Sequence, residues 1–253
     1  MNILHFSDTH GKLPQIPKKW RNGDTIIVLS GDICDNYPEE TFTPGYMYNG
    51  NFTSSNWHMW NFRLINTVLE KELQEGWIQT KLIPHLNDNK INFDNVIILK
   101  GNHDFCSFEK FFNNALDLGA KTITVQDVKF GLLTGVTKYV GEWNDEVDDS
   151  VIGERIKQID KDIHILVSHA PPYGIRDMGY GNRIGSNEIV KAIFGHYDKA
   201  IYFTNIRYHL FGHAHGQHGV DKKEVSAVTG TRIVKFVNAA QNRMNIDIDP
   251  EKW

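Results

Sequence analysis

The sequence predicts an α/β fold, because short apolar runs of strand character alternate along it with segments of helical periodicity. The apolar runs occupy residues 2–6, 25–30, 95–100, 163–168, 207–212 and 231–237. They are rich in β-branched residues and too short for helices, and polar residues or glycine follow directly after the first four. Strands that alternate with helices indicate a layered architecture. Because the later runs lie close together, we expect a mixed sheet or two sheets rather than one purely parallel sheet.

Two segments have the periodicity of helices. In the first, apolar residues recur at spacings of three and four from Trp57 to Leu73, and Gly76 is the expected end. The second segment, residues 186–195, begins with Ser186 as a candidate N-cap. The acidic segment 141–150 is expected to be a solvated loop. Residues 37–56, rich in Tyr, Asn, Thr and Gly, are interpreted equally well as a lid over a site or as a surface insertion.

Length and composition are those of one globular domain, residues 1–253, with 40% apolar and 23% charged residues. The net charge of −4 argues against a broad basic face for duplex DNA. Two cysteines, Cys34 and Cys106, are too few for a disulfide framework or a thiolate zinc cluster, and we expect buried thiols rather than a redox pair. The chain start does not have the pattern of a signal peptide and no apolar run exceeds strand length, so we expect a cytoplasmic protein without membrane contact.

Polar side chains follow five of the predicted strands, at the point where each strand ends. SDTH follows residues 2–6, GDICD follows 25–30, GNHD follows 95–100, HAPP follows 163–168 and GHAH follows 207–212. Ligands in α/β proteins gather outside the carboxyl ends of strands. We therefore expect the following side chains to meet: Asp8, His10, Asp32, Asn102, His103, His169, His213 and His215.

These residue types suit divalent metal ions. Asp, Asn and His provide oxygen and nitrogen ligands of the kind that bind Mn, Fe, Co, Ni or Zn. One carboxylate can bridge two ions, and ions about 3.5–4 Å apart can activate a water and stabilise the entering and leaving oxygens of an in-line displacement. A glycine precedes Asp32, Asn102 and His213, which permits a tight turn or a close approach of the backbone.

The motifs D-x-H, G-D-x-x-D, G-N-H-D, a lone His in SHAPP and G-H-x-H resemble, in content and order, the signature of calcineurin-like metallophosphoesterases. The resemblance runs from residue 8 to residue 215. It implies two packed mixed β-sheets flanked by helices, and two divalent metal ions, with Mn favoured over Fe, Ni, Co or Zn. It implies that one ion is bound by Asp8, His10, Asp32 and His215. It implies that the other is bound by Asp32, Asn102, His169 and His213, so that Asp32 bridges the two ions.

The resemblance also implies roles for residues that are not ligands. His103 would lie beside the substrate and stabilise the phosphoryl group or protonate the leaving oxygen. Asp104 would orient a neighbouring imidazole, as catalytic and metal-binding histidines usually require, and Asp35 would support the site. Outside these motifs, His209 is expected to be a structural histidine within a strand, and His218 a solvated side chain.

A narrower resemblance lies in residues 168–177, SHAPPYGIRD. They are similar to the HGPP-x-G-x-R-D stretch of mammalian metallophosphoesterase-domain proteins, a group with phosphodiesterase activity toward cyclic nucleotides and related esters. Some members have Gly in place of one metal-binding His of GHxH, whereas this chain keeps both. Arg176 is then a candidate phosphate-binding residue, because Arg can hold phosphate through two hydrogen bonds. The alternative is an ion pair with a nearby carboxylate such as Asp177.

We therefore expect a dinuclear-metal hydrolase of phosphodiesters, either a cyclic nucleotide or a nucleic-acid-derived ester, with a metal-bridging hydroxide as nucleophile. The alternative is a phosphomonoesterase that acts on a nucleotide or a protein. A non-catalytic scaffold is less favoured, because every motif position is filled. The expected partner is a small phosphate ester, a nucleotide or a nucleic-acid end, and the sequence leaves the oligomeric state open.

Overall fold

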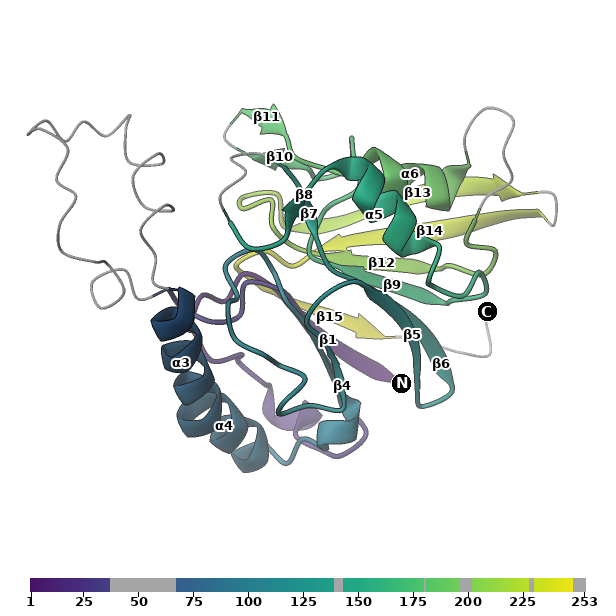
Figure 1. Ribbon diagram of the computed structural model, residues 1–253. Coiled ribbons are helices and arrows are strands. Elements are labelled where there is room, and N and C mark those ends of the chain that lie inside the picture. Colours follow the sequence, from purple (N-terminus) through teal and green to yellow (C-terminus); the bar gives the residue numbers. More distant parts are fainter. Residues whose placement is uncertain (37–66, 139–142, 180, 196–201, 228–229, 248–253) are drawn as a thin grey trace, which may run out of the picture.

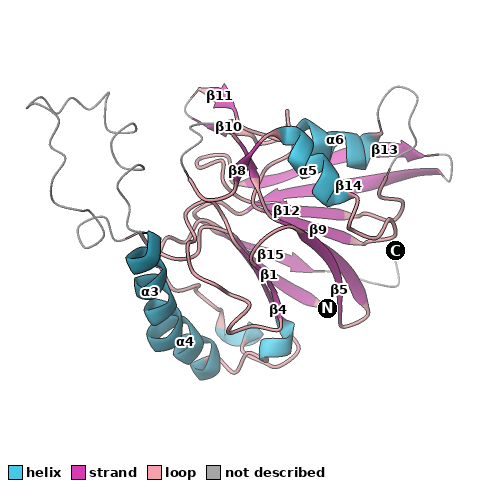
Figure 2. Ribbon diagram, in the orientation of Figure 1, coloured by secondary structure: helices cyan, strands magenta, loops and turns pink. Residues whose placement is uncertain are grey.

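The computed structural model describes residues 1–36, 67–138, 143–179, 181–195, 202–227 and 230–247. Two mixed β-sheets lie face to face, and helices cover the outer face of each sheet, so the chain forms four layers (Figures 1 and 2). The predicted lid or insertion at 37–56 and the first part of the predicted helix, residues 57–66, lie outside the described residues. No helix in the described ranges is long and apolar enough to cross a membrane.

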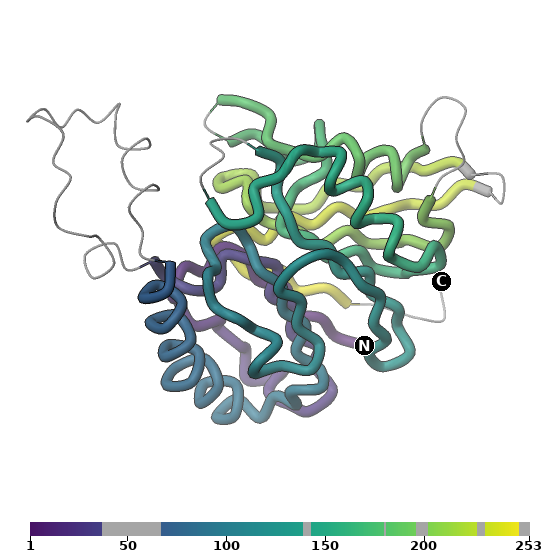
Figure 3. Tube along the Cα trace, viewed as in Figure 1, coloured from purple at the N-terminus to yellow at the C-terminus, as the bar shows by residue number. Residues whose placement is uncertain are grey.

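The first sheet has five strands, and its central strands run parallel. In spatial order they are β15 (Arg243–Asp247), β1 (Asn2–Phe6), β2 (Ile26–Ser30), β3 (Val96–Leu99) and β4 (Asn114–Leu116). Only β15 is antiparallel to its neighbour. The first and last strands of the described residues are therefore paired, as the purple and yellow parts of the tube in Figure 3 show.

The second sheet has six strands, and its four inner strands run parallel. In spatial order they are β13 (Gly219–Ala227), β14 (Gly230–Asn238), β12 (Tyr208–Phe211), β9 (Ile165–Ser168), β6 (Val128–Leu133) and β5 (Ala120–Val125). The outer strands β13 and β5 are antiparallel to their neighbours. Two small ribbons pair β7 (Val136–Thr137) with β8 (Glu146–Val147), and β10 (Met178–Gly179) with β11 (Asn182–Arg183).

The central strands of each sheet are buried on both faces, because helices cover one face and the other sheet covers the second face. In β2, Val28 packs between the sheets, while Ile27 and Leu29 point to the helices. The core between the sheets includes Ile3 and Ile97 from the first sheet. From the second sheet it includes Leu132, Val167 and Leu210.

The helix predicted to end at Gly76 continues past it. Gly76 lies within α3 (Thr67–Trp77), which runs through a π-helical turn (Ile78–Leu82) into α4 (Ile83–Asp88). A glycine inside a helix costs about 1 kcal/mol. Burial of Ile78, Leu82 and Leu86 outweighs that cost, since each buried aliphatic side chain contributes about 1.5–3 kcal/mol.

The outer face of the second sheet is covered by α5 (Asp149–Ile156) and α6 (Asn187–Phe194). Ser186 caps α6 as expected, and its Oγ accepts the N–H of Ile189. The acidic segment 141–150 differs from the expected solvated loop. Among its described residues, Asp145 forms a two-pronged ion pair with Arg155 at 2.7 and 2.8 Å, and α5 begins at its end. Short 3-10 helices occupy Lys18–Trp20 and Phe93–Asn95.

Candidate dinuclear metal centre

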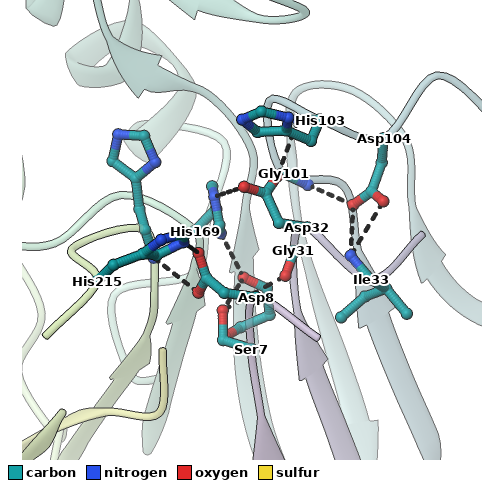
Figure 4. Close-up of polar contacts among 12 residues, drawn as sticks. Ser7, Asp8, Gly31, Asp32, Ile33, Gly101, His103, Asp104, His169 and His215 are labelled. Carbon is teal, nitrogen blue, oxygen red and sulfur yellow. Dashed lines mark hydrogen bonds and ion pairs between the residues drawn. The ribbon is translucent and has the colours of Figure 1, made fainter. Parts of the chain in front are cut away.

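The loops that follow β1, β2, β3, β9 and β12 meet at one edge of the two sheets, as the strand ends predict (Figure 4). They bring together two groups of side chains, each with ligand-capable atoms within 4.8 Å of one another. One group is Asp8, His10 and His215. The other is Asp32, His169 and His213. The sequence resemblance implies the same division into two sets.

Unpaired buried atoms show that these residues fit divalent ions. Within the described part of the chain, His10 Nε2, His169 Nε2 and Asn102 Oδ1 are buried without a hydrogen-bond partner. Such atoms are costly unless something binds them. His169 donates its Nδ1–H to the carbonyl of Ser30 at 2.8 Å, which turns Nε2 toward Asp32, where it can bind an ion once it has lost its proton. These oxygen and nitrogen donors suit Mn, Fe, Co, Ni or Zn.

The two carboxylates, of Asp8 and Asp32, are almost fully buried and are held by the motifs around them. Asp8 Oδ2 accepts the N–H of His213 at 2.9 Å, and its Oδ1 lies 2.8 Å from His215 Nε2. Asp32 Oδ1 accepts the N–H of His103 at 2.8 Å. Burial is the largest single influence and favours the neutral form of both acids, but His169 and the other neighbouring histidines together outweigh it and hold the pKa of both below the usual range.

His169 carries the matching positive charge. Burial would lower its pKa, but the carboxylates of Asp32 and Asp8 outweigh burial and raise it to about 9. His169 Nε2 lies 3.2 Å from Asp32 Oδ2. Since a metal ligand must be the neutral imidazole, an ion at this group would replace that proton. The two carboxylates and the one imidazolium thus leave a net negative charge at the site, which favours entry of a cation.

Backbone conformation at this edge is specialised. Asp8, His10, Asp32 and His213 all have positive φ, between 42° and 66°. Such conformations are unfavourable for residues other than glycine and concentrate at functional sites. A side chain on Gly101 would overlap the carboxylate of Asp32, which explains the glycine before Asn102.

His103 lies beside the ligand groups without belonging to either. Its ring centroid is 5.2 Å from that of His10 and 3.7 Å from that of Trp143. Its Nδ1 is 2.7 Å from Oδ1 of Asn36. Burial lowers the pKa of His103 to about 4, against the opposing charges of Asp32 and Asp8. The imidazole is therefore neutral at pH 7.

The structure corrects the expected contact of Asp104. Its hydrogen bonds to described residues come from backbone N–H groups and not from an imidazole: Cys34 at 2.9 Å, Ile33 at 3.0 Å and Gly101 at 2.9 Å. Asp104 therefore links the loop after β2, at Ile33 and Cys34, to the loop after β3, at Gly101 (Figure 4). Burial and then the charge of Asp32 raise its pKa to about 7.

Asp35 and the two cysteines lie beside these motifs, and a supporting role for Asp35 stays a prediction. Asp35 is exposed, and its Oδ1 accepts the N–H of Asn36. Cys34 and Cys106 are buried thiols with their Sγ atoms 3.7 Å apart, and burial raises the pKa of both.

Arg176 forms an ion pair, which was the alternative to phosphate binding, but its partner is Asp221 and not Asp177. It donates to Asp221 at 3.0 Å and to the carbonyls of Gln217 and His218 at 3.1 and 2.8 Å. Asp177 instead accepts from Arg183 at 2.6 Å. Arg176 thus stabilises the loop after GHAH, and phosphate binding by it stays a prediction.

The remaining two histidines of HLFGHAHGQH lie as expected. His209 is fully buried in β12, with Nε2 2.7 Å from Ser168 Oγ. His218 is exposed.

Three polar residues near the centre were missed from the sequence. Asn36 contacts His103, and Glu70 and Gln74 on α3 are fully buried against the same loop. The apolar pattern predicted that Val68 lies on the buried face of the helix. In the structure Val68 is 66% exposed, and Glu70 and Gln74 lie on the buried face. The only signal was the spacing of four between Glu70 and Gln74, which places them on one face of a helix.

A groove of about 450 Å³ adjoins the first ligand group. Its lining includes Asp8, His10, Lys12, Gln241 and Arg243. The volume lies within the range of small-molecule sites.

Two adjacent groups of side chains that could each hold a metal ion therefore lie at this edge, with His103 beside them and outside both. The sequence model of the calcineurin-like phosphoesterase family matches residues 1–217, and the chain belongs to this family.

The relatives are distant. The uncharacterized protein MJ1162 of Methanocaldococcus jannaschii is 24% identical, over 88% of this chain and 84% of its own length. The UPF0046 protein K07C11.7 of Caenorhabditis elegans is 30% identical, over 36% of this chain and 26% of its own. Among solved structures, a putative 5'-nucleotidase from Staphylococcus aureus is similar with a TM-score of 0.45 and 11% identity. That match covers 99% of this chain and 51% of the nucleotidase chain, so this chain spans about half its length.

Proposed function

We propose that the chain hydrolyses phosphodiesters at this centre, with a cyclic nucleotide or a nucleic-acid-derived ester as substrate. Family membership and the two ligand groups support a metal-dependent phosphoric ester hydrolase. The observation that carries the proposal is the pair of ligand groups around Asp8 and Asp32, with His103 beside them and outside both.

Two divalent ions would supply the nucleophile and charge neutralisation, since they can lower the pKa of a shared water from 15.7 toward about 7. The chain would hold them through Asp8, His10 and His215 on one side and Asn102, His169 and His213 on the other, with Asp32 between them. Mn is the favoured metal. The carboxylate of Asp104 accepts hydrogen bonds from backbone N–H groups of both loops and so holds the loops that carry Asp32 and Asn102 in a fixed relative position.

His103 would act on the substrate through Nε2, because Nδ1 is engaged by Asn36. The negative charge of a bound ester raises the pKa of the imidazole, so that it can stabilise the phosphoryl group and protonate the leaving oxygen. The groove beside His10 has room for the organic part of the ester.

A diester is favoured for two reasons. Residues 168–177 resemble a group with phosphodiesterase activity, and a diester carries a single negative charge. Nε, Nη1 and Nη2 of Arg176 all have protein partners, so the strongest candidate for holding a second phosphate charge is occupied. A phosphomonoesterase is the alternative, supported by the cations Lys12 and Arg243 that line the groove.

The test compares bis(p-nitrophenyl) phosphate with p-nitrophenyl phosphate, using Mn²⁺-loaded protein and His103→Ala as the control. We expect faster cleavage of the diester and a decrease in the variant. Faster cleavage of the monoester would establish the alternative. Cleavage of neither substrate by protein with both ions bound would contradict the proposed function.

A further inference from the structure

The structure assigns a positioning role to Asn36: its side-chain oxygen fixes the orientation and tautomer of the His103 imidazole, and Glu70 and Gln74 of α3 hold Asn36 in place. The inference rests on the proposed function, since it explains how His103 is prepared for the reaction. It concerns residues outside both ligand groups.

The hydrogen bonds of Asn36 determine which way its amide faces. Nδ2 donates to Glu70 Oε1 at 3.0 Å and to the carbonyl of His103 at 3.1 Å. Both partners are acceptors, so the nitrogen of the amide must face them and the oxygen must face the imidazole. Oδ1 then accepts a hydrogen bond from His103 Nδ1 at 2.7 Å. The proton of the neutral ring is therefore on Nδ1, and Nε2 carries the lone pair. To act as the general acid, the ring first takes up a proton from solvent at Nε2, with Nδ1–H still held by Asn36, and then passes the Nε2 proton to the leaving oxygen.

The partners of Asn36 are themselves fixed. Glu70 and Gln74 are fully buried on α3, and Gln74 Nε2 donates to Glu70 Oε1 at 3.2 Å. Gln74 also donates to the carbonyl of His103 at 3.0 Å and accepts the N–H groups of Phe105 and Cys106 at 2.7 and 3.1 Å. The helix thus holds both the side chain that orients the imidazole and the backbone that carries it. A satisfied buried network of this kind is rigid.

The position of the GNHD loop does not depend on the contact between Asn36 and the ring of His103. Gln74 already satisfies the backbone on both sides of Asp104, and Asp104 joins the same loop to the loop that follows β2. The oxygen of Asn36 adds only a fixed direction for the imidazole. A general acid must present the correct nitrogen within hydrogen-bond reach of the leaving oxygen. Asn36 provides this without placing another negative charge beside Asp32.

The first experiment measures the dependence of turnover on the leaving group. Mn²⁺-loaded protein is assayed with bis(p-nitrophenyl) phosphate, which has a good leaving group, and with diphenyl phosphate, which has a poor one. Asn36→Ala should lower kcat on diphenyl phosphate by about 10²-fold, the lower end of the range for a general acid, and on the nitrophenyl ester by much less. We expect KM and metal content to stay near the wild-type values. Asn22→Ala, at the opposite end of β2, is the matched control.

A rescue experiment separates positioning from loss of structure. Asn36→Asp keeps the oxygen that accepts from His103 but places a second carboxylate against that of Glu70. Glu70→Gln alone replaces a carboxylate oxygen that accepts from Asn36 and Gln74 by part of an amide. In the double variant, Gln at position 70 can donate to Asp at position 36, which restores the pair with donor and acceptor exchanged. We expect the double variant to recover most of the kcat lost in Asn36→Asp. Equal losses on both esters in Asn36→Ala, or no recovery in the double variant, would overturn the assignment.

A readout without activity distinguishes this inference from the proposed function. Long-range ¹H–¹⁵N spectra of the metal-free protein report the tautomer of each histidine, and His103→Ala identifies the signal of His103. The wild type should show the Nδ1–H form and Asn36→Ala a mixture, whether or not any ester is cleaved. The Nε2–H form in the wild type would refute the positioning role even if the diester is hydrolysed. Inactive wild type with the Nδ1–H form would refute the function and leave the positioning intact.

Discussion

Replacing Asp104 by alanine should lower the free energy of unfolding by about 3–5 kcal/mol. The carboxylate is fully buried and accepts the N–H groups of Ile33, Cys34 and Gly101 at 2.9–3.0 Å. Each buried donor left without a partner costs about 1–3 kcal/mol, and relaxation or a water entering the void recovers part of the total. Asp104→Asn keeps one acceptor oxygen and turns an N–H toward a backbone N–H, so it should cost about 2 kcal/mol.

Urea unfolding followed by circular dichroism, at pH 7 with EDTA, measures this effect without metal ions. Asp127→Asn is the matched control: Asp127 is exposed and has positive φ, which Asn also tolerates, so its effect should be within about 0.5 kcal/mol. A loss below about 1 kcal/mol in Asp104→Ala would refute the assignment. Asp104 would then act on the site by some other contact.

Three further outcomes are expected. Burial lowers the pKa of His209 to about 3, whereas an unfolded histidine titrates near 6.5, so the unfolded chain binds the proton and stability falls as pH drops below about 6.5. The free energy of unfolding, measured with urea, should decrease between pH 7.5 and pH 5 by about 2 kcal/mol less in His209→Gln than in the wild type. An equal decrease in both proteins would show that His209 does not contribute to it. Because the pKa of His169 is raised to about 9, metal binding at pH 7 should release a proton, and the affinity should increase as pH rises toward 9. Calorimetry in two buffers of different ionisation enthalpy measures the released proton, and identical heats in both buffers would show that none is released. Asp32→Ala should lose both bound metal, measured by mass spectrometry, and hydrolysis; retention of both would show that Asp32 does not bridge.

The sequence predicted the strands and the centre because both depend on local pattern. A buried parallel strand is a short apolar run, and its end carries the functional residue, so the order of the runs places Asp8, Asp32 and His213 at one edge. The N-cap at Ser186 follows in the same way, from one side chain and the turn after it.

The rest depended on tertiary packing that local pattern does not encode. Gly76 is a helix stop only when no buried residues follow, and the apolar stripe of Ile78 and Leu82 continues the helix. Gln74 is buried because the GNHD loop presents backbone groups to it, a contact between segments about thirty residues apart, and Glu70 accepts from Gln74 and Asn36. Asp104 was assigned to an imidazole by resemblance, although three backbone N–H groups surround it.

The most direct test of the central claim is a crystal structure of the protein grown with Mn²⁺, read from its anomalous difference map. Two peaks are expected about 3.5–4 Å apart, the usual separation in two-metal sites. One should lie among Asp8, His10 and His215 and the other among Asn102, His169 and His213, with Asp32 touching both. A single peak, or peaks away from these side chains, would contradict the dinuclear centre.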